Sequence, residues 1–165
     1  MGASLNNLAG IYQAQGRTSE AEPLLLRALA MGEQQLGKDH PNVATSLNNL
    51  VELYRAQGRY GEAEPLLLRA LAIREQQLGK DHPDVATSLN SLANLYYAQG
   101  RYREAEPLYL RALAILFEKL GDNHPTTQTV RQNFRRFLQQ VMQVGQTAQL
   151  SQHPLTQDLL RQMRE

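Results

Sequence analysis

The stretch LGKDHPNVATSLNNL, residues 36–50, returns almost unchanged as LGKDHPDVATSLNSL at residues 78–92. Alignment on this phrase divides most of the chain into three repeats of 42 residues, and the first and second are identical at 33 of 42 positions. The second and third are identical at 27 of 42 positions. Such a fixed period indicates stacked repeats, because one repeat cannot bury its apolar face alone. The chain therefore divides into repeat 1 (1–45, matching from Ser4), repeat 2 (46–87), repeat 3 (88–129) and a degenerate C-terminal part (130–165).

Each repeat is predicted to form two helices, which we name helix A and helix B. The helix A that runs into repeat 2 begins just before the repeat boundary, at Pro41, because proline suits the first position of a helix, and Asp39 or His40 is expected to cap it. Apolar residues then follow at helical spacing until Gly58, a residue that commonly ends helices. The apolar stripe of helix B resumes after this glycine and runs to Gly79.

The C-terminal part differs from the repeats in sequence and in charge. RQNFRRFLQQVMQV (131–144) predicts an amphipathic helix that covers the open end of repeat 3, while QTAQLSQHP predicts a loop and LTQDLLRQMRE a short final helix. This part carries 5 basic and 2 acidic residues, whereas residues 1–129 carry 12 and 14. We interpret Arg131, Arg135 and Arg136 as the polar outside of a cap. Nucleic-acid contact is the alternative, but no stacking aromatic residues or groove-reading motif accompany these arginines.

Composition narrows the classes of partner. The formal net charge is +1, so no overall electrostatic field favours nucleic acid or an anionic membrane, and neither is expected as a partner. No apolar stretch is long enough to span a membrane, and the N-terminal residues do not resemble a secretion signal. The absence of cysteine fits a reducing compartment, and we expect a cytoplasmic location.

Enzyme chemistry finds little support in the sequence. His40, His82 and His124 recur at one point of the repeat, and successive copies lie a whole repeat apart, so they cannot converge on one metal ion. We interpret them as polar residues at helix starts. Ser46 and Ser88 lie near two of these histidines, but no nucleophile elbow or glycine-rich phosphate loop surrounds them. We therefore expect no catalysis, no metal and no cofactor.

The repeat resembles a known family. The repeats of that family usually have a period of about 34 residues. Their spacing of large and small apolar residues is also found in this chain, although leucine replaces the family's characteristic tryptophan. The 42-residue period and the phrases LGKDHPDVATSLN and GRYGEAEPL are similar to the tetratricopeptide repeats of kinesin light chains. This resemblance implies an all-α, right-handed superhelical solenoid of antiparallel helix pairs with a C-terminal capping helix. In repeat 2 the matching positions are Leu47, Leu50, Val51, Tyr54, Ala63, Leu67 and Ala70.

Helix A positions spaced i, i+4 and i+7 form a ridge beside the apolar stripe. The first position is asparagine in all three repeats, while the other two vary. In the resembled family the A helices line a concave groove, in which asparagine amides hold the backbone of an extended peptide. The alternative is a merely solvent-exposed ridge. The predicted peptide-binding residues are Asn6, Gln13, Asn48, Glu52, Arg55, Asn90, Asn94, Tyr97 and Arg136, with Gly10, Gln132 and Gln139 on the same ridge.

Two further groups of polar residues are expected to lie off this ridge. Asn7, Asn49 and Ser91 follow the ridge asparagines by one residue, about 100° further around the helix, and are expected to bond neighbouring helices or loops. Arg69 and Arg74 of helix B are expected to be exposed on the outer face.

The expected function is protein–protein interaction through this groove. Arg55 and Arg136 favour a carboxylate on the ligand, Glu52 opposes it, and Tyr97 offers a flat apolar contact. Kinesin light chains are similar in preferring short acidic peptides with an aromatic anchor. An acidic peptide is therefore one expected ligand.

A structural role is the alternative function, in which the array spaces or oligomerises the domains of a larger protein and has no specific peptide ligand. Repeat 1 lacks the DHPxVA that should precede Ser4, so we expect the chain to come from a longer array. The apolar face of its first helix A then lacks a preceding helix B, which predicts end-to-end self-association.

Overall fold

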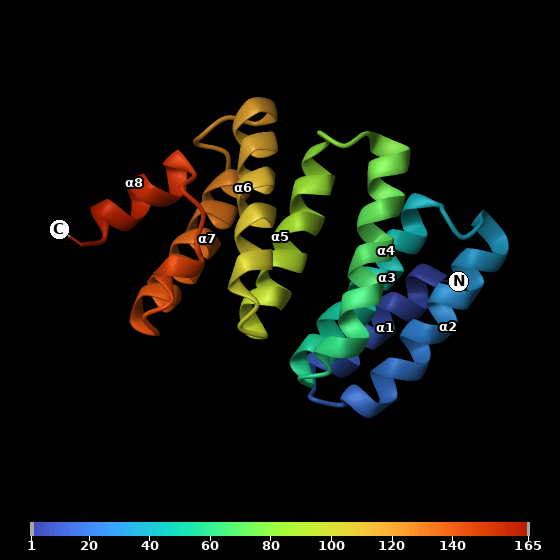
Figure 1. The fold of residues 1–165 in the computed structure, drawn as a ribbon. Helices are drawn as coiled ribbons and strands as arrows, with labels where there is room; N and C mark the ends of the chain where they lie inside the picture. The colour runs from blue at the N-terminus through green and yellow to red at the C-terminus, as the bar shows by residue number, and fades with distance from the viewer. Residues whose placement is uncertain (1, 165) are drawn as a thin grey trace. The chain divides into compact units, whose positions relative to one another are not determined.

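The computed structural model describes the backbone of residues 2–164 and the side chains of residues 4–164, and within that range it is helical, without strands (Figure 1). The predicted helix A and helix B alternate along the chain, followed by a short 3₁₀ turn and a last helix. The elements are α1 (Gly2–Ala14), α2 (Thr18–Leu36), α3 (Pro41–Ala56), α4 (Tyr60–Leu78), α5 (Pro83–Ala98), α6 (Tyr102–Lys119), α7 (Pro125–Gln143), η1 (Thr147–Gln149) and α8 (Pro154–Gln162).

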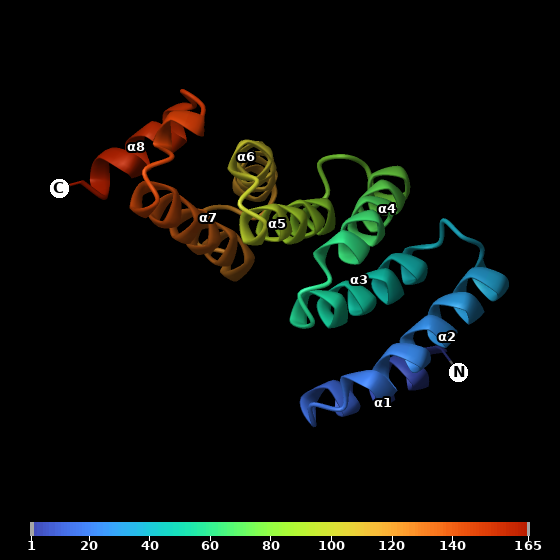
Figure 2. The ribbon, with the colours of Figure 1, turned by 60° about the horizontal axis from the view of Figure 1, so that its bottom comes forward.

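The chain forms two compact units, unit 1 (Met1–Lys80) with α1 to α4 and unit 2 (Asp81–Glu165) with α5 to α8. In unit 1 each helix packs against the next, and α1 also contacts α3. In unit 2, α5 packs against α6, α6 against α7, and α7 against both α5 and α8. Figure 2 shows helices A and B lying side by side within each unit.

Histidine side chains cap the N-termini of four helices. Nδ1 of His40 accepts a hydrogen bond from the backbone N–H of Asn42 at 3.1 Å, so His40 rather than Asp39 is the N-cap of α3. Each capping histidine precedes a proline at the first helical position, where a missing N–H leaves no helix hydrogen bond unmade. The interpretation of His40, His82 and His124 as helix-start residues is thus confirmed, and His153, which was predicted to lie in a loop, caps a helix as well. The other three, His82, His124 and His153, bond the N–H two residues on at 3.1–3.2 Å.

Small and branched apolar residues build the core of unit 1. Val43, Leu47 and Ala70 are fully buried where α3 and α4 pack together. Alanine at this point lets the two helices approach closely, so the site has no room for a larger or charged side chain. In unit 2 aromatic side chains make up more of the core, and the ring centroids of Tyr109 and Phe137 lie 5.3 Å apart.

A carboxylate on α2 fastens repeat 1 to repeat 2. Glu22 accepts hydrogen bonds from the Tyr54 hydroxyl at 3.1 Å and from Nη1 of Arg59 at 2.8 Å. The guanidinium of Arg59 lowers the pKa of the Glu22 carboxyl, because it bonds the charged form, and burial raises the pKa of Tyr54. Glu22 is therefore ionised at neutral pH and holds two residues of the following repeat.

The same position in repeat 3 fastens the C-terminus in a different way. Glu106 is two repeats beyond Glu22 and only 2% exposed, but Leu138 and Gln143 stand where Tyr54 and Arg59 would be. The carboxylate of Glu106 accepts instead from the N–H and hydroxyl of Ser151 and from the hydroxyl of Thr156, each at 2.7 Å. The C-terminal segment thus supplies the donors that a further full repeat would have supplied.

The segment before α8 departs in detail from the prediction. The stretch predicted as a loop contains the 3₁₀ turn Thr147–Gln149, and the final helix begins at Pro154, one residue earlier than predicted, because His153 caps it. The amphipathic helix predicted from residue 131 is the C-terminal part of α7, which starts at Pro125.

Candidate functional site

The ridge residues of unit 1 lie on α1 and α3, and several of their polar side chains already have partners. Nδ2 of Asn6 donates to Oγ of Ser46 on α3 at 3.4 Å. Glu52 and Arg55 form an ion pair at 3.0 Å, one turn apart on α3. The amide of Asn48 is assigned in the orientation that satisfies its neighbours, in which its oxygen accepts from both terminal nitrogens of Arg74, at 3.0 and 2.7 Å. Part of the polar capacity of this ridge is therefore used inside the repeat array.

The ridge of unit 2 shows the same pattern. Asn90 accepts from Nδ2 of Asn133 on α7 at 3.2 Å. Oδ1 of Asn94 accepts from the hydroxyl of Tyr109 at 2.5 Å. Tyr97 is half-buried and meets Phe137 edge-on, with ring centroids 5.9 Å apart. Arg136, by contrast, is exposed on α7.

These contacts give the asparagines a structural role that the repeat pattern alone did not reveal. An amide group has two N–H donors and an oxygen with two lone pairs, so one internal hydrogen bond leaves capacity for a ligand. The predicted ridge residues are half-buried or exposed within their own units, as a binding surface requires.

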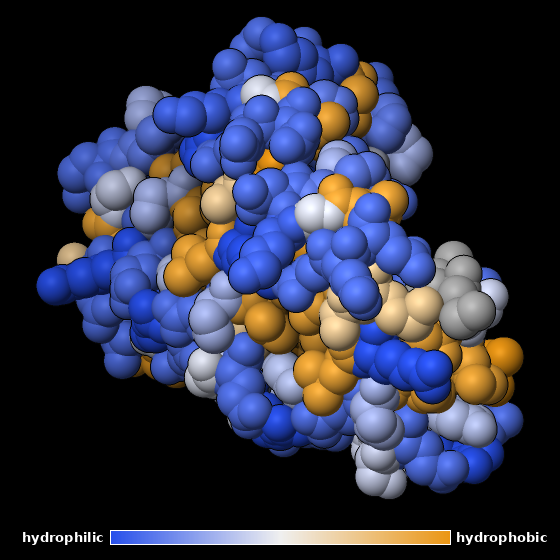
Figure 3. Space-filling view, turned by 90° about the vertical axis from the view of Figure 1, so that its right-hand side faces the viewer, coloured by the Kyte–Doolittle hydropathy of each residue, from blue (hydrophilic) through white to orange (hydrophobic). Residues whose placement is uncertain are grey.

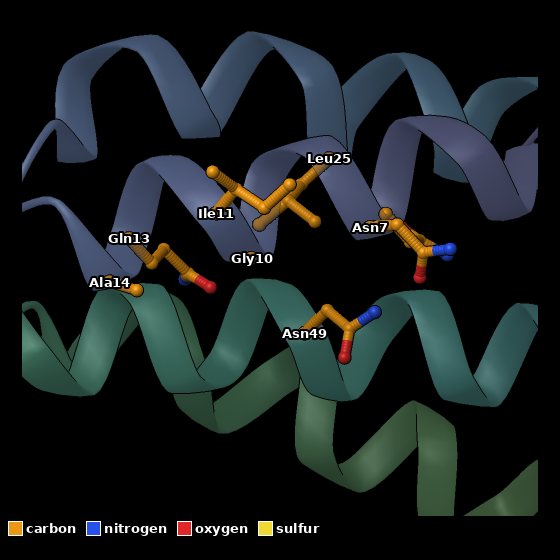
Figure 4. Close-up of a pocket in the computed structure, with 8 residues that line it drawn as sticks. Asn7, Gly10, Ile11, Gln13, Ala14, Leu25 and Asn49 are labelled. Carbon is orange, nitrogen blue, oxygen red and sulfur yellow. The ribbon is translucent and has the colours of Figure 1, made fainter.

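An open hollow of about 490 Å³ lies beside α1 in unit 1. Gly10 helps to form it, because a Cβ placed on this residue would have no atom within 4 Å. Figure 4 shows its lining on α1 and the facing helix α3, with Leu25 of α2 behind, so that polar amides lie beside apolar groups. The lining residues are Asn6, Asn7, Gly10, Ile11, Gln13, Ala14, Leu25 and Asn49.

Asn7 and Asn49 were expected to bond neighbouring helices, but the structure places both on the wall of this hollow. Between α1 and α3 the bond comes from the preceding residue, Asn6, which bonds Ser46, whereas Asn133, at the position of Asn49 in the degenerate part, does bond Asn90 on α5. Three other residues of its lining, Asn6, Gly10 and Gln13, were placed on the binding ridge by the sequence.

Helix B gives a second correction. Arg69 and Arg74 were expected to be exposed on the outer face, and both are in fact half-buried and bonded. Arg69 pairs with Glu33 at 2.5 Å and donates to the carbonyl of Lys38 at 2.9 Å. Arg74 reaches back to Asn48 on the paired helix A. The long arginine stems allow these heads to reach partners that sequence spacing does not indicate.

The described residues carry neither a metal-site cluster nor a membrane-spanning helix. Within residues 2–164, no three His, Asp or Glu side chains gather as a metal site would require. Over the same range, no helix combines the length and the apolar character needed to cross a membrane.

The crystal structure of nearly identical, kinesin light chain-like TPR repeats from Podosopora anserina is 29% identical to this chain, with a TM-score of 0.72, over 96% of this chain and 82% of that one. A point variant of that protein gives the same values. The crystal structure of BtubC from P. vanneervenii is 25% identical, with a TM-score of 0.75, over 96% of this chain and 61% of that one. The predicted all-α, tetratricopeptide-like fold class is confirmed by these likenesses.

No curated protein matches the chain. The sequence profile described as tetratricopeptide repeat matches residues 1–76 and, in a second overlapping match, residues 48–118. These matches cover well over half of the chain, and the resemblance drawn from the repeat phrases is confirmed. The chain belongs to the tetratricopeptide repeat family.

Proposed function

We propose that this chain binds an extended peptide, or an extended segment of a protein partner, along the surfaces of its A helices. Tetratricopeptide repeats are generally protein–protein interaction modules, and folds of this kind are non-catalytic scaffolds. The observation that carries the proposal is the open, amide-lined hollow beside α1. Amides can pair with peptide N–H and C=O groups whatever the side chains of the peptide are.

The proposed binding surface has one part in each unit. In unit 1 it comprises Asn6, Gln13 and Asn48, with Glu52 and Arg55 beside them. The Glu52–Arg55 ion pair weakens the preference for an acidic ligand, because a ligand carboxylate would share the guanidinium with Glu52. In unit 2 the proposed residues are Asn90, Asn94, Tyr97 and Arg136, of which exposed Arg136 is the one that favours a carboxylate on the peptide.

Replacing Gln13 and Asn49 together with alanine tests this function. Both side chains line the hollow outside the core, so helicity should not change. The change removes at least two hydrogen bonds to peptide, at about 0.5–1.5 kcal/mol each, and affinity should fall on the order of tenfold. The measurement is calorimetric titration with a peptide selected from a library of extended sequences.

Arg27→Ala is the control, since Arg27 is exposed on α2 and away from the hollow. If Arg27→Ala bound the peptide more weakly while the double variant bound it as before, the ligand would have to lie on the outer face. If no peptide of the library binds the unaltered chain even at millimolar concentration, the proposal is wrong.

The structural alternative, oligomerisation, is favoured by a separate observation. Leu8 and Ile11 on α1 are 38% and 53% exposed, whereas their equivalents one repeat later, Leu50 and Leu53, are 1% and 0% exposed. Figure 3 is the view from the right-hand side of Figure 1, where α1 and α2 are drawn, and hydrophobic residues are visible in it among hydrophilic ones. The exposed large hydrophobic side chains are Leu8, Ile11, Leu26, Leu36, Leu68, Leu78 and Val144.

The exposed face of α1 is expected to drive end-to-end self-association, because α3 buries the same positions between α2 and α4. Sedimentation velocity should show a sedimentation coefficient that rises with protein concentration, and Ile11→Lys should abolish the rise. Leu68→Lys is the matched control, since Leu68 is 45% exposed on α4. A monomer at every concentration would contradict this prediction.

A further inference from the structure

One asparagine recurs in all three repeats, as Asn6, Asn48 and Asn90, and its side-chain oxygen has a different environment in each. In repeat 2 it accepts two hydrogen bonds from the guanidinium of Arg74. In repeat 3 it accepts from the amide of Asn133. In repeat 1 the oxygen of Asn6 is buried and finds no donor among the described residues. A buried acceptor without a donor is unfavourable, so a donor that reached it would bind favourably.

The cause is a single residue on helix B. Gly32 of repeat 1 stands at the position of Arg74 in repeat 2, and Leu116 takes that position in repeat 3. Glycine supplies neither the guanidinium nor the aliphatic stem that would carry it across to the asparagine. A hollow of about 320 Å³ is found at this place, close to the lower end of the usual range for ligand pockets. Asn6, Ala28, Gly32, Gln35, Leu36, Asn42, Thr45 and Ser46 line it.

The lining of this hollow suits the side chain that repeat 2 carries. Leu36 is 47% exposed and offers an apolar wall to an aliphatic stem, while Gln35, Asn42 and Thr45 are polar. Among the described residues that line it, none is basic and would repel a cation. Glu33, next to Gly32, is paired with Arg69. Recognition therefore depends on the Asn6 oxygen and on the shape of the hollow.

We propose that the hollow at Gly32 is a subsite for an arginine side chain of the bound peptide, whose guanidinium donates to Asn6 as Arg74 donates to Asn48. A planar guanidinium can direct two N–H groups at one oxygen. The compact ammonium group of lysine makes such a paired contact less well. This subsite rests on the proposed peptide-binding function, since the arginine comes from the partner. It names one side chain that the partner carries.

Two substitutions at Gly32 separate the subsite from a general effect on the helix. Gly32→Arg installs the chain's own guanidinium beside Asn6 and fills the hollow. Gly32→Ala is the matched control: a Cβ at this position lies 3.7 Å from Cγ2 of Val43, an ordinary contact, and leaves most of the hollow open. Both substitutions remove the helix penalty of glycine, so their difference reports on the guanidinium.

The probe is N-acetyl-arginine amide, titrated into ¹⁵N-labelled protein while the side-chain amide signal of Asn6 is followed by NMR. We expect saturable binding in the millimolar range, unchanged within about twofold in Gly32→Ala and weakened at least about tenfold in Gly32→Arg. N-acetyl-norleucine amide, which has the stem without the donors, should not bind. Equal binding of the arginine probe to wild type and Gly32→Arg, or no binding to wild type, would overturn the subsite.

A thermal measurement tests the same geometry without ligand. Gly32→Arg should melt several degrees above Gly32→Ala, because the new guanidinium satisfies the Asn6 oxygen, and the increment should vanish when Asn6 is also alanine. An increment that persists without Asn6 would contradict the proposed contact. If the chain binds selected peptides but not the arginine probe, only the proposed subsite is wrong. If it binds the probe but no extended peptide, the proposed peptide-binding function is wrong.

Discussion

Replacing Ala70 with aspartate is expected to unfold unit 1. Ala70 is fully buried on α4, packed with Val43 and Leu47 of α3, and the described side chains of this cluster are all apolar. An aspartate there must either lose its hydration without a partner or bind a proton, and both outcomes cost free energy. The free energy of unfolding should fall by about 3–5 kcal/mol, the cost of an uncompensated buried charge.

Urea unfolding followed by circular dichroism measures this effect, and Ala72→Asp is its matched control. Ala72 lies two residues further along the same helix and is exposed, so aspartate there should cost no more than about 0.7 kcal/mol of helix propensity. Equal stability of the two variants would show that the core of unit 1 does not lie where α3 meets α4.

Glu106→Ala is expected to release the C-terminal helix α8. The carboxylate of Glu106 is the shared acceptor for Ser151 and Thr156, and Thr156 is fully buried. Without it, the buried hydroxyl of Thr156 loses its partner at a cost of about 1–3 kcal/mol, whereas exposed Ser151 can bond water instead. This cost is relieved if α8 detaches and the Thr156 hydroxyl reaches water. Amide exchange in residues 150–162 should accelerate on the order of tenfold to a hundredfold, since each tenfold corresponds to about 1.4 kcal/mol.

Hydrogen exchange read by mass spectrometry makes this measurement, with Glu104→Ala as the control. Glu104 lies on the same helix, but its ion pair with Arg101 is exposed, and such pairs contribute about 0–1 kcal/mol. Protection of α8 that survives Glu106→Ala would mean that apolar packing alone, through Leu159 and Leu160, holds the helix in place.

The helix boundaries could be predicted from the sequence because they depend on neighbouring residues. His40 and Pro41 start α3 and Gly58 follows its end, and the same signals recur one repeat later at His82 and Pro83. A cap bonds an N–H two residues away, and a glycine with positive φ ends a helix within one turn. Because the same local signals recur every 42 residues, the helix ends of one repeat predict those of the others, and the repeated phrases indicate the family.

The candidate site was only partly predictable. The ridge carrying Asn48 and Asn90 follows from helical spacing, but its bonds to Arg74 and Asn133 do not. These partners lie on other helices, 26 and 43 residues away in sequence, and spacing along one helix does not say which long side chain can reach them. For the same reason, spacing along one helix did not predict that Asn49 and Gly32 each line a hollow, because these hollows form only where α1, α2 and α3 pack together.

The sequence by itself determined the period, the helix ends and the family, because capping, glycine turns and apolar periodicity act over three or four residues and recur in every repeat. Only the tertiary structure decided which polar groups are satisfied. Glu22 and Glu106 occupy the same repeat position, yet their carboxylates have different donors. The oxygen of Asn6 has none among the described residues, although Asn48 and Asn90, at the same position, both have one. A buried polar atom bonds whatever donor the packed neighbour presents within about 3 Å. A different residue on that neighbour, such as Gly32 where the next repeat has Arg74, therefore changes which hydrogen bonds the atom makes although its own repeat position is unchanged.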